Sequence, residues 1–117
     1  MGSIENQLIA AIRANDFPQV KELFANNNIN PNCHGQDDRH QWTPLGAAAN
    51  RKNPSVEMVD FLIAQGADIN MPDCDGYTPI MMAVAPDKKH VLKALLEREL
   101  EYDKITVKLS NVNQVYD

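Results

Sequence analysis

Two segments of this chain share one pattern: QWTPLGAAA at residues 41–49 and GYTPIMMAV at residues 76–84. Each contains Thr-Pro, then an aliphatic residue, then small or apolar residues. Threonine is favoured just before a helix because its side chain accepts hydrogen bonds from the first free N–H groups. Proline fits the first helical position because that N–H has no partner within the helix. The pattern therefore predicts helices that begin after Thr43 and Thr78.

A second apolar run follows each segment, at residues 56–63 and 91–96. The two threonines are 78 − 43 = 35 residues apart, and the equivalent leucines of the second runs, Leu62 and Leu95, are 95 − 62 = 33 apart. A period of about 33 residues, with a Thr-Pro start and two helices in each unit, is typical of a repeat protein.

The composition agrees with a small folded protein. A chain of 117 residues has room for one domain or about three such repeats, and no apolar run is long enough to span a membrane. The net charge of −5 disfavours nucleic acid and anionic membranes as partners, and it weakly favours a basic protein surface. Two cysteines make no disulfide framework, which favours a reducing cytosol.

The N-terminal part predicts another helix pair without a Thr-Pro start. Asp16 is placed to cap the second helix of this pair. The apolar residues recur at helical spacing in both helices: Ile4, Leu8, Ile9 and Ile12 in the first, and Phe17, Val20, Leu23 and Phe24 in the second. Mixed polar character suits the end of a stack, where one side has no neighbour.

The connections differ in length. The segment around residues 33–40 holds four residues more than the period requires, and two more lie near residues 51–53. The third pair begins at Thr78 and turns at Pro86. For residues 104–117 the sequence does not decide between a short strand, an irregular segment that covers the exposed face of the third pair, and the start of a helix.

The motifs Thr-Pro-Leu at Thr43, Gly-Ala-Asp-Ile-Asn at residues 66–70 and Asp-Gly-Tyr-Thr-Pro at residues 75–79 occur in register. Through them, residues 8–103 resemble the ankyrin repeat family. The histidine that the family usually has after Thr-Pro-Leu is replaced by Gly46 and Met81.

The resemblance implies an all-α solenoid of stacked helix-turn-helix pairs with β-hairpin fingers. It would be one domain over residues 1–117, with repeats near 4–32, 38–70 and 73–103 and a tail at 104–117. It also implies a non-catalytic module that binds a protein partner through its finger tips and the concave face of its first helices.

Carried over by position, the contact residues of the family fall on two fingers and on the end of one helix. They are Arg39, His40, Trp42, Asn50, Arg51, Cys74, Asp75 and Tyr77. The Asp37–Asp38 pair is either a solvated loop or a contact for basic residues of the partner. Trp42 is either an energetic centre of binding or a residue that packs the finger onto the next repeat, since aromatic side chains serve both purposes.

Such a module suits a stoichiometric inhibitor or immunity protein that masks a basic partner. It equally suits the recognition segment of a bacterial effector or a signalling scaffold. We expect a cytoplasmic monomer without metal or cofactor.

The alternative function is a zinc-binding protein or a hydrolase that uses the fingers. For zinc, the candidate ligands are Cys33, His34, His40 and Cys74. For a hydrolase, Cys33, His34 and His40 would supply the nucleophile and base, and Asp37–Asp38 the carboxylate. No short paired cysteine spacing supports zinc, and the sequence has no glycine-rich phosphate loop, serine elbow or His-Glu-x-x-His motif.

Overall fold

The computed structural model describes residues 3–35 and 41–100. These ranges contain helices and loops and no β-strand. The helices occur in three pairs. They are α1 (Ile4–Arg13) with α2 (Phe17–Asn26), α3 (Pro44–Asn50) with α4 (Val56–Ala64), and α5 (Pro79–Met82) with the helical residues 89–100, which follow the short 3₁₀ helix η1 (Pro86–Lys88).

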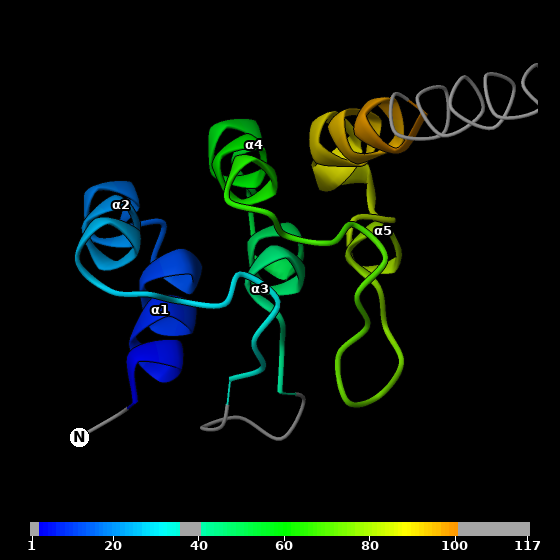
Figure 1. Cartoon of the computed structure of the whole chain (residues 1–117). Coiled ribbons are helices and arrows are strands. Elements are labelled where there is room, and N and C mark those ends of the chain that lie inside the picture. Colours follow the sequence, from blue (N-terminus) through cyan, green and yellow to red (C-terminus); the bar gives the residue numbers. More distant parts are fainter. Residues whose placement is uncertain (1–2, 36–40, 101–117) are drawn as a thin grey trace, which may run out of the picture.

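The pairs stack side by side into two layers (Figure 1). The first helices α1, α3 and α5 form one layer, in which α3 packs against both α1 and α5. The second helices α2 and α4 and the residues 89–100 form the other layer, and the loops between pairs project beyond the first layer. The predicted all-helical stack is therefore confirmed.

The predicted helix starts are confirmed by side-chain caps. The Thr43 hydroxyl accepts the Gly46 N–H at 3.0 Å, and the Thr78 hydroxyl accepts the Met81 N–H at 3.4 Å. Asp16 accepts the N–H of Gln19 at 3.3 Å at the start of α2. Each cap supplies a partner for an N–H group that the first helical turn cannot satisfy itself.

Two helices end in the same way with different residues. Gly66 after α4 has φ 103°, and Asn15 after α1 has φ 56°. In each case the next residue donates its N–H to a carbonyl five residues earlier, from Ala67 to Leu62 and from Asp16 to Ala11. This left-handed ending suits glycine because it has no side chain, and asparagine tolerates it better than most residues.

The core runs through the whole stack. α3 is made of proline, leucine, glycine and alanine up to Ala49, and all of those residues are buried. Small side chains let the helices on both sides approach α3 closely, and larger residues fill the space between the layers. The largest of these fully buried residues are Leu8, Ile12, Leu45, Met58, Leu62 and Leu95.

The third pair is less regular than the sequence predicts. Its first helix, α5, is a single turn from Pro79 to Met82, whereas α3 continues to Asn50. Proline at position 86 disfavours a helical conformation in the residue before it, and Ala85 is indeed extended with φ −156° and ψ 151°. The helix therefore ends early and the chain resumes in η1.

Polar side chains tie each repeat to the one before it. Arg51 donates to the carbonyl of Arg13 at 3.3 Å, and Lys88 donates to the carbonyl of Asn50 at 2.9 Å. Further contacts of this kind join residues 34 to 38 positions apart, which is about one repeat. They are Asn32 with Gly66 and Asp68, His34 with Pro72, His90 with Pro54, and Arg98 with Asp60.

Among the described residues, a hairpin-type backbone hydrogen bond is found in each of the two fingers. Gly35 donates its N–H to Trp42 in the first finger, and Asp73 donates to Tyr77 in the second. The four predicted extra residues of the first finger fall largely within 36–40, outside the described residues. The tail at 104–117 also lies outside them. The proposed repeat boundaries stay predictions.

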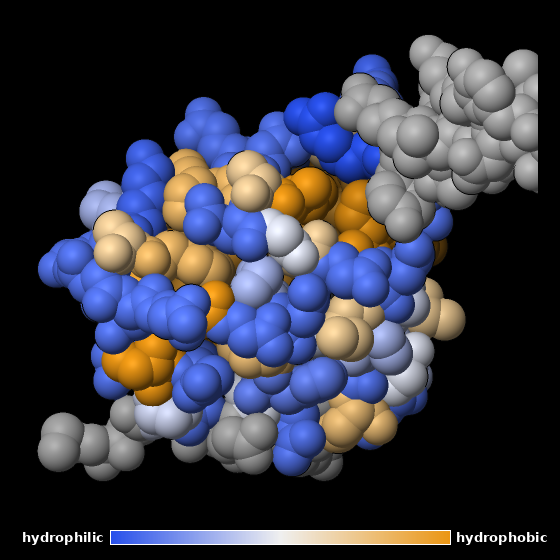
Figure 2. All heavy atoms as spheres, viewed as in Figure 1, coloured by the Kyte–Doolittle hydropathy of each residue, from blue (hydrophilic) through white to orange (hydrophobic). Residues whose placement is uncertain are grey.

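The surface of the face seen in Figure 2 is mostly hydrophilic, with apolar side chains in small separate groups. One of these groups lies between α4 and the last helix. In the part of the chain that is described, no helix has both the length and the apolar composition needed to cross a membrane.

Candidate functional site

Four of the predicted contact residues lie outside the described residues. They are Asp37, Asp38, Arg39 and His40, all in the first finger. The other six, Trp42, Asn50, Arg51, Cys74, Asp75 and Tyr77, are described, and three of them come together at one place.

Trp42 joins the first and second repeats. Its ring is half-buried and packs against the core, and the guanidinium carbon of Arg13 lies 4.5 Å from its ring centroid. Its backbone carbonyl accepts the N–H of Gly35. Trp42 therefore holds the finger against α1, and part of the ring still borders an open hollow.

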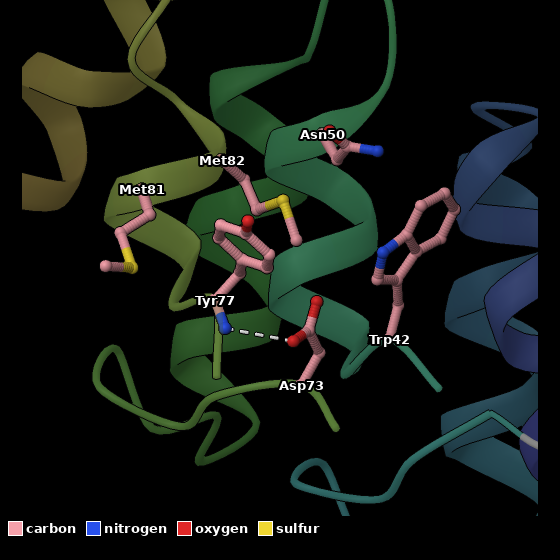
Figure 3. A pocket seen from close by; sticks show the side chains of 6 residues that line it. All are labelled: Trp42, Asn50, Asp73, Tyr77, Met81 and Met82. Atoms are coloured by element: carbon pink, nitrogen blue, oxygen red, sulfur yellow. Dashed lines mark hydrogen bonds between the residues drawn. The ribbon is translucent and has the colours of Figure 1, made fainter. Parts of the chain in front are cut away.

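The hollow has a volume of about 270 Å³ and lies between the second and third repeats. Figure 3 shows it between the helices α3 and α5 and the two fingers. Six residues line it: Trp42, Asn50, Asp73, Tyr77, Met81 and Met82. The structure thus brings the predicted residues Trp42, Asn50 and Tyr77 to one surface.

The other three predicted residues do not line this hollow. Arg51 donates to the carbonyls of Arg13 and Asn53, so its guanidinium serves contacts within the chain. Cys74 and Asp75 are exposed at the tip of the second finger. Whether these residues contact a partner stays a prediction.

Asp73, Met81 and Met82 are additional residues of the hollow. Asp73 is only 6% exposed, and its Oδ1 accepts the N–H groups of Asp75 and Tyr77, both at 2.9 Å. An aspartate two residues before an Asp-Gly turn is a signal for such a loop closure. Met81 occupies a position where the sequence departs from the family pattern, and the structure puts its side chain 55% exposed at the hollow.

The two cysteines have different surroundings. Cys33 is half-buried, and its desolvation raises the thiol pKa, with a smaller upward contribution from the negative charge of Glu5. Cys74 is exposed. A raised pKa lowers the thiolate fraction at neutral pH, which makes Cys33 a weak nucleophile and a weak metal ligand.

The predicted zinc ligands do not form a group within the described residues. His34 Nε2 lies 3.0 Å from the carbonyl of Pro72, and His40 is not described. In residues 3–35 and 41–100, no three His, Cys, Asp or Glu side chains are arranged to hold a metal ion. No observation therefore favours the zinc or hydrolase alternative.

Comparisons with known proteins agree with the repeat architecture. A model of the family "Ankyrin repeats (3 copies)" matches residues 8–106. The chain is 30% identical over 97 residues to "26S proteasome non-ATPase regulatory subunit 10" of Dictyostelium discoideum, a match that covers 82% of this chain and 40% of that protein. It is 41% identical over 84 residues to "Alpha-latrocrustotoxin-Lt1a" of Latrodectus tredecimguttatus, covering 72% of this chain and 6% of the toxin.

The chain spans less than half the length of either relative. The family match, however, covers three consecutive repeats and includes all of the residues 8–103 in which the sequence shows the repeat pattern. In the structure, α3 and α5 begin directly after Thr43 and Thr78, at the Thr-Pro positions of the repeat pattern. The chain therefore belongs to the ankyrin repeat family, whose members are generally protein-interaction modules.

Proposed function

We propose that this protein acts by binding a protein partner, without catalysis, through the fingers and the first helices of its second and third repeats. The observation that carries this proposal is the hollow lined by Trp42 and Tyr77 on two neighbouring repeats. Tryptophan and tyrosine are among the residue types that most often carry binding energy in protein interfaces.

The surface is suited to binding because it is formed before the partner arrives. α3 is buried along nearly its whole length, and Trp42 is fixed by the core and by Arg13. Side chains that are already ordered lose less conformational entropy on binding, so more of the contact energy appears as affinity. Tyr77 and Met81 are 53% and 55% exposed and remain available for contact.

The charge of the protein favours a basic partner surface. The net charge is −5, and the second finger carries Asp73 and Asp75 within three residues of each other. Complementary charge mainly raises the association rate and selects among partners. We expect the affinity to fall with increasing salt, since exposed charges are screened.

Several biological roles fit such a module. As a separate protein it would act as a stoichiometric inhibitor or immunity protein, as a cytoplasmic monomer. As part of a larger protein it would be the recognition segment of an effector or scaffold. One relative is by its name a regulatory subunit of the 26S proteasome, which supports a binding role.

The first prediction tests binding with two variants in the hollow. Trp42→Ala and Tyr77→Ala should each weaken partner binding by more than about 1 kcal/mol, because both remove aromatic area from the centre of the surface. The partner would be captured with the native chain, identified by mass spectrometry and then measured by calorimetry.

The control is Val84→Ala. Val84 belongs to the same repeat and is 69% exposed, but it does not line the hollow. The affinity of the Val84→Ala variant for the partner should equal that of the native chain. Trp42→Ala also removes packing, so Tyr77→Ala, at a half-exposed position, separates binding from stability. Full affinity in the Tyr77 variant, with an unchanged melting temperature, would place the contact surface elsewhere.

A further inference from the structure

Asp73, which lines the hollow, has one carboxylate oxygen that the described residues leave without a hydrogen-bond partner. Asp73 Oδ1 accepts two backbone N–H groups, while Oδ2 is buried and accepts none. In Figure 3 one oxygen faces Tyr77 and the other is directed toward the space between Tyr77 and Trp42. A buried carboxylate is costly unless its charge is compensated by hydrogen bonds or a cation. The second oxygen is therefore unsatisfied until something binds beside it.

The cations near the hollow are committed to other contacts. The Lys88 ammonium group donates to the carbonyls of Asn50 and Met82, at 2.9 and 3.4 Å. The Arg13 guanidinium lies over the Trp42 ring. Among the described residues, neither group forms an ion pair with Asp73. The charge of Asp73 thus favours a cation that the described residues do not supply.

The walls of the hollow suit a flat cation on an aliphatic stem. Tyr77 and Trp42 supply aromatic surface, and Met81 and Met82 supply flexible thioethers that adapt to the shape of a ligand. A guanidinium stacks on aromatic rings and is less strongly hydrated than an ammonium group. The chain itself already uses this contact, where Arg13 stacks on Trp42.

The size of the hollow points to a single side chain. Its volume of about 270 Å³ lies near the lower end of the range of about 300–1,000 Å³ that is typical of ligand pockets, and it can hold one side chain. The aliphatic stem of such a side chain would lie along Met81 and Tyr77, which are more than half exposed. Its charged end would then lie next to Asp73.

We propose that this hollow is a receptor site for one arginine side chain of the protein partner, with Asp73 as the counter-charge and Tyr77, Trp42 and the two methionines as the walls. The inference rests on the proposed function, because it names the chemical group that the binding surface receives. It also explains why an acidic module would prefer a basic partner.

The experiment uses the full chain and capped arginine, N-acetyl-arginine amide, as the probe. The chain has one tryptophan, so the indole N–H of Trp42 gives a single nuclear magnetic resonance signal that reports on the hollow. We expect this signal and the amide signals of Tyr77 and Met81 to shift and saturate with a Kd on the order of 1 mM, the range for a ligand of this size. Capped citrulline, the neutral analogue, should bind at least about tenfold more weakly.

The matched variants test the role of the charge. Asp73→Asn keeps an oxygen for the two backbone N–H groups and removes the charge, so the Kd for capped arginine should rise at least about tenfold. Met81→Lys places a positive charge at the exposed edge of the hollow and should have the same effect. Val84→Lys adds the same charge on the same repeat outside the hollow and should leave the Kd unchanged.

Equal shifts with capped arginine and capped citrulline, or with capped lysine, would overturn the arginine assignment. An unchanged Kd for capped arginine in both Asp73→Asn and Met81→Lys would also overturn the assignment. The two substitutions lie at different positions, so a folding defect in one variant does not affect the other. If a captured partner depends on Tyr77 while capped arginine does not bind, the proposed function stands and this inference fails. If capped arginine binds and no protein is captured, the site is real and the proposed function fails.

Discussion

Single polar residues set where the helices begin. How much each cap contributes to the free energy of unfolding depends on its surroundings. Thr43 is only 2% exposed and its hydroxyl accepts the Gly46 N–H at 3.0 Å. The equivalent Thr78 is half-buried and its cap bond is longer, at 3.4 Å. Thr43 also begins a seven-residue helix in the middle of the stack, whereas Thr78 begins a single turn. The same motif therefore stabilises the second repeat more than the third.

This difference predicts unequal effects of removing the two caps. Thr43→Ala should lower the free energy of unfolding by about 2 kcal/mol, the upper part of the range for a lost cap, and Thr78→Ala by about 0.5–1 kcal/mol. Urea denaturation followed by circular dichroism measures both. Thr43→Ser keeps the hydroxyl and should recover most of the loss. Equal losses in the two alanine variants would contradict a role for burial and helix length.

At the scale of elements, the first helices α1 and α3 are each completed by the repeat that follows. The last carbonyls of a helix have no partner inside it. Arg51 supplies a donor to the end of α1 and Lys88 supplies one to the end of α3, and the two residues are 88 − 51 = 37 positions apart. A positive charge at the C-terminal end of a helix is also favourable for its dipole. The repeats are therefore joined by polar contacts as well as by the apolar core.

Lys88 and its neighbour Lys89 offer a matched test of this junction. Lys88→Ala should lower the free energy of unfolding by about 1 kcal/mol, because two carbonyls lose a charged donor that is half-buried. Lys89 is exposed, and Lys89→Ala should change stability by less than about 0.5 kcal/mol. Both variants remove one positive charge and can be compared in a single denaturation series. A similar loss in both would mean that overall charge, and not the junction, is responsible.

At the scale of the whole molecule, the second helices α2 and α4 of neighbouring repeats are joined by aromatic contacts. The Phe61 ring of α4 makes edge-to-face contacts with Phe17 and Phe24 of α2, with ring centroids 5.4 and 5.7 Å apart. These two rings belong to the first repeat, so the contact lies between repeats. A repeat stack depends on such interfaces because a single repeat cannot bury its own apolar face.

Removing the central ring of this group should weaken the whole stack. Phe61→Ala should lower the free energy of unfolding by about 2 kcal/mol, less than for a fully buried phenylalanine because Phe61 is only partly buried. Phe61→Leu keeps most of the apolar volume and should lose about 1 kcal/mol, the worth of the aromatic geometry. The melting temperature and a urea titration measure both. Equal stability of the alanine and leucine variants would show that the volume of this side chain contributes nothing.

The repeat fold could be predicted from the sequence because its signals are local. The Thr-Pro starts, the left-handed glycine at Gly66 and the apolar residues at helical spacing act within one helix or turn, and they recur at the period of the repeat. The caps at Asp16, Thr43 and Thr78 and the two-layer stack agree with that pattern. The short α5 was a departure from the prediction. Its cause, Pro86, is visible in the sequence.

The proposed binding surface was only partly predictable, because it is made by residues about one repeat apart. Position in the family pattern indicated Trp42, Asn50 and Tyr77, which the stack brings together. The unpaired oxygen of Asp73, the contact between Arg13 and Trp42 and the inward contacts of Arg51 depend on how two repeats pack. The sequence alone therefore determined the helices, their caps and their order. The stacking decided which side chains share a surface and which charge remains uncompensated, since those properties arise only between neighbouring repeats.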